Sequence, residues 1–95
     1  MQIAPTQVTT LDNVQMNFYH CNKGEGLPMH SHSYSHITYC VSGSCLVTQD
    51  GKFRTITSNT KPLILKANFQ HEIEALENGT AFVNAFTLET TGEKI

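Results

Sequence analysis

Short strand-like runs separated by turn residues recur along this chain, and no segment has a sustained helical period. Asp50-Gly51 and Asn78-Gly79 are residue pairs that favour two-residue hairpin turns, and Ser42-Gly43 favours a further tight turn. Turns at intervals of about eight to twelve residues are typical of an antiparallel sandwich or barrel. The pattern therefore predicts an all-β antiparallel fold, and the need to protect strand edges favours its closure into a barrel.

Seven runs have the alternation, or the β-branched and aromatic content, of strands. We expect these strands at 14–21, 36–41, 45–48, 53–57, 63–65, 71–76 and 81–88. In the first of them Val14, Met16 and Phe18 share one face, which we expect to be the buried one. Met16 and Phe18, together with Met29, are expected either to line a ligand cavity or to belong to the barrel core.

The 95 residues are expected to form a single domain, residues 1–95, with a modest hydrophobic core. Its irregular parts are expected to be an N-terminal arm or edge strand at 1–13, a loop at 22–28 and a frayed tail at 90–95. The formal net charge is -2 and no basic cluster is present, so we expect no nucleic-acid partner.

The sequence contains neither a membrane-length apolar run nor the basic-then-apolar pattern of a signal peptide. Its three cysteines, Cys21, Cys40 and Cys45, form no CxxC pair. An odd number of cysteines without an export signal is typical of reduced, buried thiols. We therefore expect a cytoplasmic protein without membrane contact.

Three histidines stand at even positions just after a Gly/Pro turn. On an extended chain His30 and His32 would point to the same side, with Cα atoms roughly 6.6 Å apart, and could bind one ion at about 2.0–2.1 Å each. His36 shares their parity if residues 33–35 bend without a change of register. His71 lies far along the chain and can join them only if the fold closes on itself. Four neutral imidazoles suit zinc, copper, iron or nickel better than magnesium or calcium.

The spacing of these residues resembles the first signature of the cupin superfamily. That signature is a glycine, five residues, His-x-His, three or four residues, a glutamate, six residues and a glycine. Gly24, His30, His32 and Gly43 stand at the corresponding positions, whereas His36 occupies the glutamate position.

The second cupin signature, Pro-x-Gly, two residues, His, three residues and Asn, is present only in part. His71 stands at the histidine position. Lys66, Asn68 and Ala75 replace the proline, the glycine and the asparagine. The two signatures and their strands cover roughly residues 14–88.

The resemblance implies a double-stranded β-helix, or jelly-roll barrel, with one divalent transition-metal ion in its mouth. By this resemblance His30, His32 and His71 are metal ligands, and His36 is a fourth ligand in place of the glutamate. Alternatively, His36 packs or forms a hydrogen bond while the ion takes three histidines and water. The resemblance does not distinguish between iron, nickel, zinc, copper and manganese as the metal. It also implies a homodimer, and the N-terminal arm is a candidate to cross from one subunit to the other.

Other polar residues near this pattern have two interpretations each. Glu25 could replace the missing carboxylate only from a loop, and Glu72 should face the opposite side of its strand. His20 is expected to be structural or at the surface. Cys40 would be a wall residue or a thiol near the ion, and Asn84 would meet a ligand in the mouth or form a structural hydrogen bond.

Three functions are compatible with these observations. The first is a metal-dependent, oxygenase-type enzyme acting on a small organic molecule. The second is a non-catalytic metal- or ligand-binding module. The third is a metal-free barrel with a histidine-lined pocket. No independent general base stands out in the sequence, so an enzyme would depend on the Lewis acidity of the ion.

Overall fold

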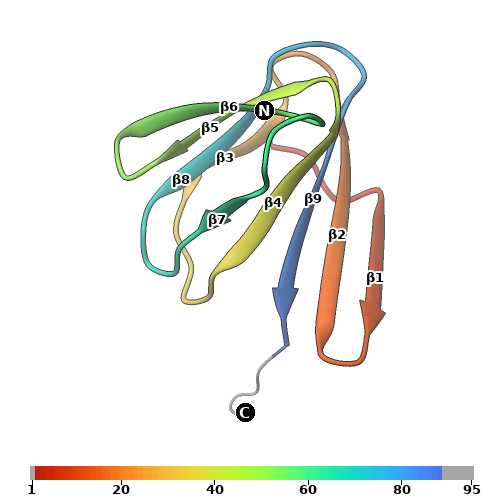
Figure 1. Cartoon of the computed structure of the whole chain (residues 1–95), viewed down its shortest axis with the longest axis vertical. Helices are drawn as coiled ribbons and strands as arrows, with labels where there is room; N and C mark the ends of the chain where they lie inside the picture. The colour runs from red at the N-terminus through yellow and green to blue at the C-terminus, as the bar shows by residue number, and fades with distance from the viewer. Residues whose placement is uncertain (1, 89–95) are drawn as a thin grey trace.

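Two antiparallel sheets pack face to face in the structure, a computed structural model that describes residues 2–88 (Figure 1). In that part of the chain the strands are β1 (Gln7–Leu11), β2 (Val14–Cys21), β3 (Gly26–His30), β4 (His36–Ser42), β5 (Ser44–Gln49), β6 (Lys52–Thr57), β7 (Leu63–Leu65), β8 (His71–Ala75) and β9 (Thr80–Thr87). One sheet has the order β1-β2-β9-β4-β7 and the other the order β3-β8-β5-β6. The chain passes repeatedly between the two sheets, and the expected all-β antiparallel barrel is confirmed. Among the described residues there is no helix of the length and hydrophobicity that a membrane crossing requires.

The hydrophobic core lies between the two sheets and takes alternate residues from each. The Tyr19 ring of β2 stacks on the Phe82 ring of β9, with centroids 4.8 Å apart. Ile73 of β8 and Val47 of β5 are cross-strand partners and are both buried. The other buried apolar residues are Cys21, Cys40, Cys45, Ile56, Leu65 and Ala75. The three cysteines are thus buried free thiols, as expected.

The prediction for the faces of β2 is wrong. Met16 and Phe18 lie on the outer side of the sheet, whereas Asn17 and Tyr19 face inward. The register that pairs Tyr19 with Phe82 sets this orientation. Both sides of β2 carry apolar residues, so its alternation alone could not identify the buried face.

Two further expectations about local structure are corrected. Strand β3 begins at Gly26, inside the segment expected to be a loop. The backbone of Gly26 lies so close to that of Ile73 on β8 that a Cβ at this position would collide with it. Only glycine therefore allows β3 to approach β8 this closely. Asn78-Gly79 does turn the chain, but it connects β8 to β9, which belong to different sheets, and so it does not close a hairpin. Asp50-Gly51 forms the expected hairpin turn between β5 and β6, with positive φ at both residues.

The N-terminal segment pairs with β3 of its own chain. Gln2 forms a bridge with Gly26, and the backbone N–H of Ile3 donates to the Gly26 oxygen at 3.1 Å. Strand β1 then forms the edge of the five-stranded sheet. The tail expected at 90–95 lies outside the described residues.

The turn glycine Gly43 generates a prediction about stability. It has a φ of 72°, and a Cβ there would collide with the Thr80 side chain and lie 2.8 Å from the Thr80 Cα. Gly51 has a similar φ of 78° but open space around it. We expect Gly51→Ala to lower the free energy of unfolding by about 1 kcal/mol and Gly43→Ala by at least about 2–3 kcal/mol in urea denaturation. Equal losses would contradict the close approach of Gly43 to β9.

Candidate metal centre

Four histidines meet where strands end at the mouth of the barrel. His30 is the last residue of β3, His36 the first of β4 and His71 the first of β8, while His32 lies in the connection from β3 to β4. The rings of His30 and His71, which are cross-strand partners, have centroids 4.4 Å apart. The other close ring pairs are His32–His71 at 4.8 Å, His32–His36 at 5.2 Å, His30–His32 at 5.3 Å and His36–His71 at 5.3 Å.

Three of these histidines have the arrangement of a metal-binding cluster. The ligand atoms that His30, His32 and His71 can offer all lie within 4.8 Å of one another. Nitrogens that share one ion at about 2.0–2.1 Å lie no more than about 4.2 Å apart, so this spacing is close to what one shared cation requires. The structure thus brings together residues from both sequence signatures, as the resemblance implies.

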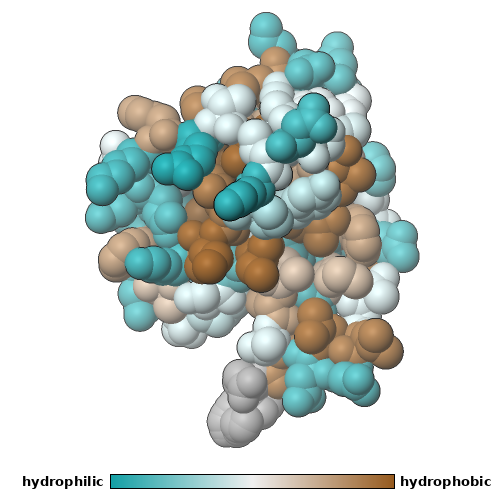
Figure 2. All heavy atoms as spheres, viewed as in Figure 1, coloured by the Kyte–Doolittle hydropathy of each residue, from teal (hydrophilic) through white to brown (hydrophobic). Residues whose placement is uncertain are grey.

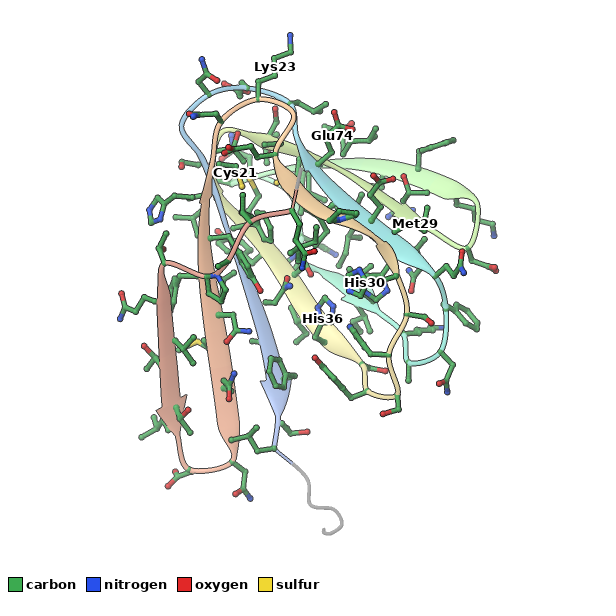
Figure 3. The ribbon with its side chains drawn as sticks, turned by 180° about the vertical axis from the view of Figure 1, so that it is seen from behind. Cys21, Lys23, Met29, His30, His36 and Glu74 are labelled. Atoms are coloured by element: carbon green, nitrogen blue, oxygen red, sulfur yellow. The ribbon has the colours of Figure 1, made fainter. Side chains whose placement is uncertain are left out.

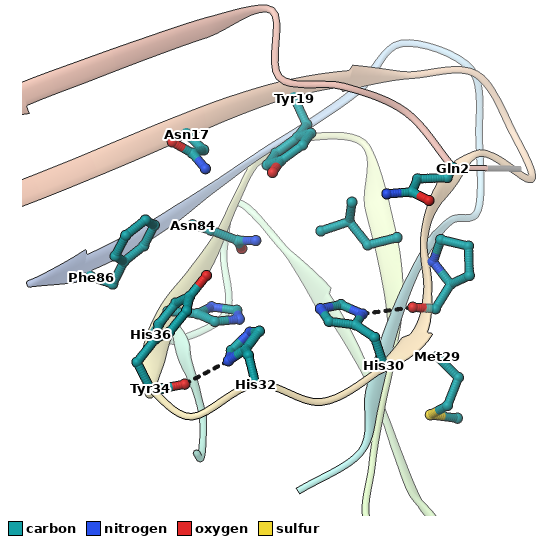
Figure 4. Close-up of a pocket in the computed structure, with 12 residues that line it drawn as sticks. Gln2, Asn17, Tyr19, Met29, His30, His32, Tyr34, His36, Asn84 and Phe86 are labelled. Atoms are coloured by element: carbon teal, nitrogen blue, oxygen red, sulfur yellow. Dashed lines mark hydrogen bonds between the residues drawn. The ribbon is translucent and has the colours of Figure 1, made fainter. Parts of the chain in front are cut away.

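Hydrogen bonds at the back of each ring determine which nitrogen is free. In these three histidines Nδ1 lies close to the backbone carbonyl oxygen of a residue two positions away. The pairs are His30 with Pro28 at 2.7 Å, His32 with Tyr34 at 2.7 Å and His71 with Phe69 at 3.1 Å (Figure 4 shows the first two). A carbonyl oxygen can only accept, so each Nδ1 carries the hydrogen and each neutral ring keeps its lone pair on Nε2.

His36 reaches the same tautomer through side chains. Its Nδ1 lies 3.1 Å from Thr38 Oγ1, whose hydroxyl donates to Asn84 Oδ1 at 2.7 Å. Because that hydroxyl proton is already used, Thr38 Oγ1 accepts from Nδ1–H and leaves the His36 Nε2 unprotonated. His36, Thr38 and Asn84 are all buried. Asn84 therefore makes the structural hydrogen bond that is one of its two expected roles, and its side chain also lines the mouth.

Burial favours the neutral form of His36 and His71. Burial, and then the nearness of the other three imidazoles, lowers the pKa of His36 to about 4, and burial likewise lowers the pKa of His71. Neutral imidazole is the form that coordinates metals.

The buried nitrogen of His71 fits a bound ion. Its side chain is 0% exposed, and its Nε2 has no hydrogen-bond partner among the described residues. Buried polar atoms are nearly always paired, and an unpaired one is unfavourable by roughly 1–3 kcal/mol. A cation held by the neighbouring nitrogens would satisfy this atom.

The cluster opens into a cavity of about 320 Å³ (Figure 4). His30, His32 and His36 form one side of it, and no Asp, Glu, Lys or Arg is among its described lining residues. The amides of Gln2, Asn17 and Asn84 and the rings of Tyr19, Tyr34 and Phe86 lie around the mouth. Sequence reasoning identified Asn84 and Met29 as candidates but missed Asn17 and Tyr19, because it assigned the wrong face of β2 to the interior.

The remaining candidate ligands lie elsewhere. Glu25 Oε1 accepts from the backbone N–H of Asn22 at 2.8 Å in the loop before β3. The exposed His20 contacts Thr6 outside the cavity. Cys40 is a wall residue, since its buried thiol donates to the Ser42 carbonyl at 3.3 Å. Figure 3 shows Cys21 and Glu74 near one end of the barrel, away from His30 and His36.

Comparison with known proteins identifies the fold. No protein-family model matches the sequence, and no curated protein is similar to it in sequence. KdgF from Halomonas sp. superposes with a TM-score of 0.79 at 17% identity, over 92% of this chain and 80% of that one. An RmlC-like cupin from Shewanella frigidimarina gives 0.76 at 18% identity, over 92% and 78% of the two chains. Oxalate decarboxylase from Bacillus subtilis gives 0.71 at 21% identity, over 80% of this chain and 21% of that one. The chain therefore has the cupin fold.

The hydrogen bonds at Nδ1 predict an unusual uniformity of tautomers. We expect long-range ¹H–¹⁵N NMR spectra of the metal-free protein, recorded at a pH where the imidazoles are neutral, to show protonated Nδ1 and unprotonated Nε2 in all four cluster histidines. Thr38→Val removes the acceptor of His36 alone and should change only the His36 signals. A protonated Nε2 in any of the four wild-type rings would contradict the arrangement.

Proposed function

We propose that this cupin binds one divalent transition-metal ion through His30, His32 and His71, with His36 as a fourth ligand, and binds a small organic anion beside it. The observation that carries the proposal is the buried, unpartnered Nε2 of His71. The three other histidines surround it, each with Nε2 as its free nitrogen.

The donor set favours a particular group of metals. Neutral imidazoles suit zinc, copper, iron and nickel, whereas magnesium, calcium and manganese favour oxygen ligands. His36 occupies the position at which the family signature has a glutamate, so the described cluster includes no carboxylate. The positive charge of a bound ion would therefore not be compensated by its protein ligands.

This charge indicates the class of ligand. The lining has neither a lysine nor an arginine among the described residues, so only the ion would attract an anion. Asn84 uses its Oδ1 to accept from Thr38, and Asn17 uses its Oδ1 to accept from Gln15 at 2.9 Å. The N–H group of Asn84 remains available to donate to an anionic oxygen in the cavity, whereas that of Asn17 also interacts with the Tyr19 hydroxyl. Oxalate, which names one structural neighbour, belongs to this class of small chelating anions.

Two uses of such a site are compatible with this geometry. A bound ion supplies Lewis acidity and, if it is iron or copper, oxygenase-type redox chemistry. The chain itself holds the histidine nitrogens in place, positions amide donors and surrounds the ligand with Tyr19, Tyr34 and Phe86. The absence of a carboxylate or lysine from the described lining favours the second candidate, a non-catalytic metal- or ligand-binding module.

Metal binding is tested by removing one histidine at a time. We expect Zn²⁺ or Ni²⁺ to bind the wild type in calorimetry and to raise its melting temperature. His32→Ala, in a half-buried loop position, and His36→Ala should each weaken binding by about 100-fold or more, because a lost hydrogen-bond partner behind a ligand alone accounts for roughly 10- to 100-fold. His20→Ala is the matched control and should bind as the wild type does. Unchanged affinity in His36→Ala would reduce the site to three histidines, and unchanged affinity in His32→Ala would refute it.

The ligand class is tested with oxalate as the probe. We expect calorimetry to detect oxalate binding to the metal-loaded protein and none to the metal-free protein. Oxygen uptake and product formation by the iron-loaded protein would identify an enzyme, whereas saturable binding without turnover would identify a binding module. Equal binding with and without metal would contradict the proposed role of the ion.

A further inference from the structure

The shortest strand of the barrel, β7, lies at an edge of the five-stranded sheet. It has three residues, of which Leu65 is buried whereas Ile64 is 60% exposed. Figure 2 shows hydrophobic side chains gathered on the surface over β4 and β7. One edge of β7 pairs with β4, and its other edge has no hydrogen-bonded strand beside it in the part of the chain that the structure describes. The backbone groups of that second edge therefore need another partner.

The side chain of Gln49 on β5 is this partner. Its Nε2 donates to the carbonyl oxygen of Ile64 at 3.3 Å, and its Oε1 accepts from the backbone N–H of Lys66 at 2.7 Å. The amide thus bonds to the backbone on both sides of Leu65, as a residue of a neighbouring strand would. Gln49 is half-buried and belongs to the four-stranded sheet, so its amide joins the two sheets on this side of the barrel.

The bond from Lys66 depends on a departure from the second cupin signature. Lys66 stands at the position of the signature proline, and proline has no backbone N–H. The lysine therefore adds a donor directly after β7, and Gln49 supplies the acceptor for it. This bond could not form in a chain that keeps the proline.

The next two backbone N–H groups hold the connection from β7 to β8 against the connection from β3 to β4. The Ala67 N–H donates to Ser35 Oγ at 2.9 Å, and the Asn68 N–H donates to the His32 carbonyl oxygen at 2.7 Å. Asn68 has a positive φ of 69°, a conformation that asparagine adopts more readily than most residues. Three consecutive N–H groups are thus bonded to other parts of the barrel mouth.

These bonds lie next to the candidate ligands. Gln49 is the cross-strand partner of His71 on β8, and Leu65 is the cross-strand partner of His36 on β4. The Gln49 amide therefore links the strand pair that carries His71 to the strand pair that carries His36. His30 and His71, by contrast, lie on paired strands of one sheet. The position of His36 relative to His71 thus depends on a side-chain bond, whereas that of His30 depends on backbone pairing.

We propose that Gln49 is a positioning residue for the candidate metal centre. Its amide, together with the Ser35 hydroxyl, sets the positions of His36 and His32 relative to His71, whose ring centroids lie 5.3 Å and 4.8 Å away. One shared cation requires the nitrogens of these rings to lie close together, so a displacement between the sheets would weaken its binding. The inference rests on the proposed metal binding, but the ring arrangement can be measured without an ion.

Nuclear Overhauser effects between the imidazole rings test the arrangement in the metal-free protein. Gln49→Met keeps the approximate size of the side chain and removes both hydrogen bonds. We expect it to weaken the cross-peaks between His36 and His71 and to leave those between His30 and His71 unchanged. Gln70→Met is the matched control, an exposed glutamine of the same connection whose hydrogen bond is made by its backbone, and it should change neither set.

Calorimetry with Zn²⁺ gives a second measurement. We expect Gln49→Met to bind Zn²⁺ about 10-fold more weakly than the wild type, the lower end of what the loss of a group behind a ligand causes. Gln70→Met should bind as the wild type does. If circular dichroism shows that Gln49→Met does not fold, Ser35→Ala decides instead, and it should weaken both the cross-peaks between His32 and His71 and the binding of Zn²⁺.

Four outcomes separate this proposal from its alternatives. Unchanged cross-peaks between His36 and His71 in a folded Gln49→Met variant would overturn it. Equal weakening of the cross-peaks between His30 and His71 would also overturn it, because the barrel would then have loosened as a whole. A less stable variant with unchanged Zn²⁺ affinity would make Gln49 a purely structural residue. A wild type that binds no Zn²⁺ would refute the proposed function, and the cross-peaks alone would then decide whether Gln49 positions the rings.

Discussion

The pairing of β3 with β8 at the barrel mouth is the constraint on which the candidate metal centre depends. His30 and His71 are cross-strand partners, although they lie far apart in the sequence. The two strands can approach because Gly26 has no side chain to meet the backbone of Ile73. A register shift between Leu27 and His30 then brings the two histidines opposite each other. The site is thus a consequence of strand pairing, and the imidazoles need no support from a helix or a long loop.

Once the rings are together, hydrogen bonding determines what they can do. Burial lowers the pKa of His36 and of His71, so both are neutral at physiological pH and keep one lone pair each. In every cluster ring the Nδ1 proton is taken by an acceptor of the barrel itself, which leaves Nε2 for a ligand. Thr38 and Asn84 fix the tautomer of His36 in the same way, at the position where the cupin signature has a glutamate. An imidazole there needs an acceptor behind it, and the Thr38 hydroxyl, oriented by Asn84, provides one.

Local sequence signals predicted much of this arrangement, and the predictions that were wrong have a common physical cause. The His-x-His spacing and the turn pairs depend on backbone geometry within a few residues, so the sequence alone identified the four histidines and the Asp50-Gly51 hairpin. The choice of partner strand depends on residues far away. For this reason Asn78-Gly79 was correctly expected to turn but wrongly expected to close a hairpin. Both sides of strand β2 carry apolar residues, so only its pairing with β9 shows that Asn17 faces the cavity. Gly26 lies in a glycine-rich segment that is typical of a loop, yet its lack of a side chain is what allows β3 to pair with β8.

Strand β4 shows how the register of one strand determines which of its residues reach the candidate metal centre. Its inward residues His36 and Thr38 belong to that centre, whereas Ile37, the residue between them, points to the outer side of the sheet and is 47% exposed. Because side chains alternate with a period of two, a slip of one residue would bring Ile37 inward and expose a candidate ligand histidine. That slip would also separate the Thr38 hydroxyl from Asn84, because the pairing of Thr38 with Asn84 depends on the register between β4 and β9. The same strand pairing therefore places the imidazole in the cavity and the acceptor behind it.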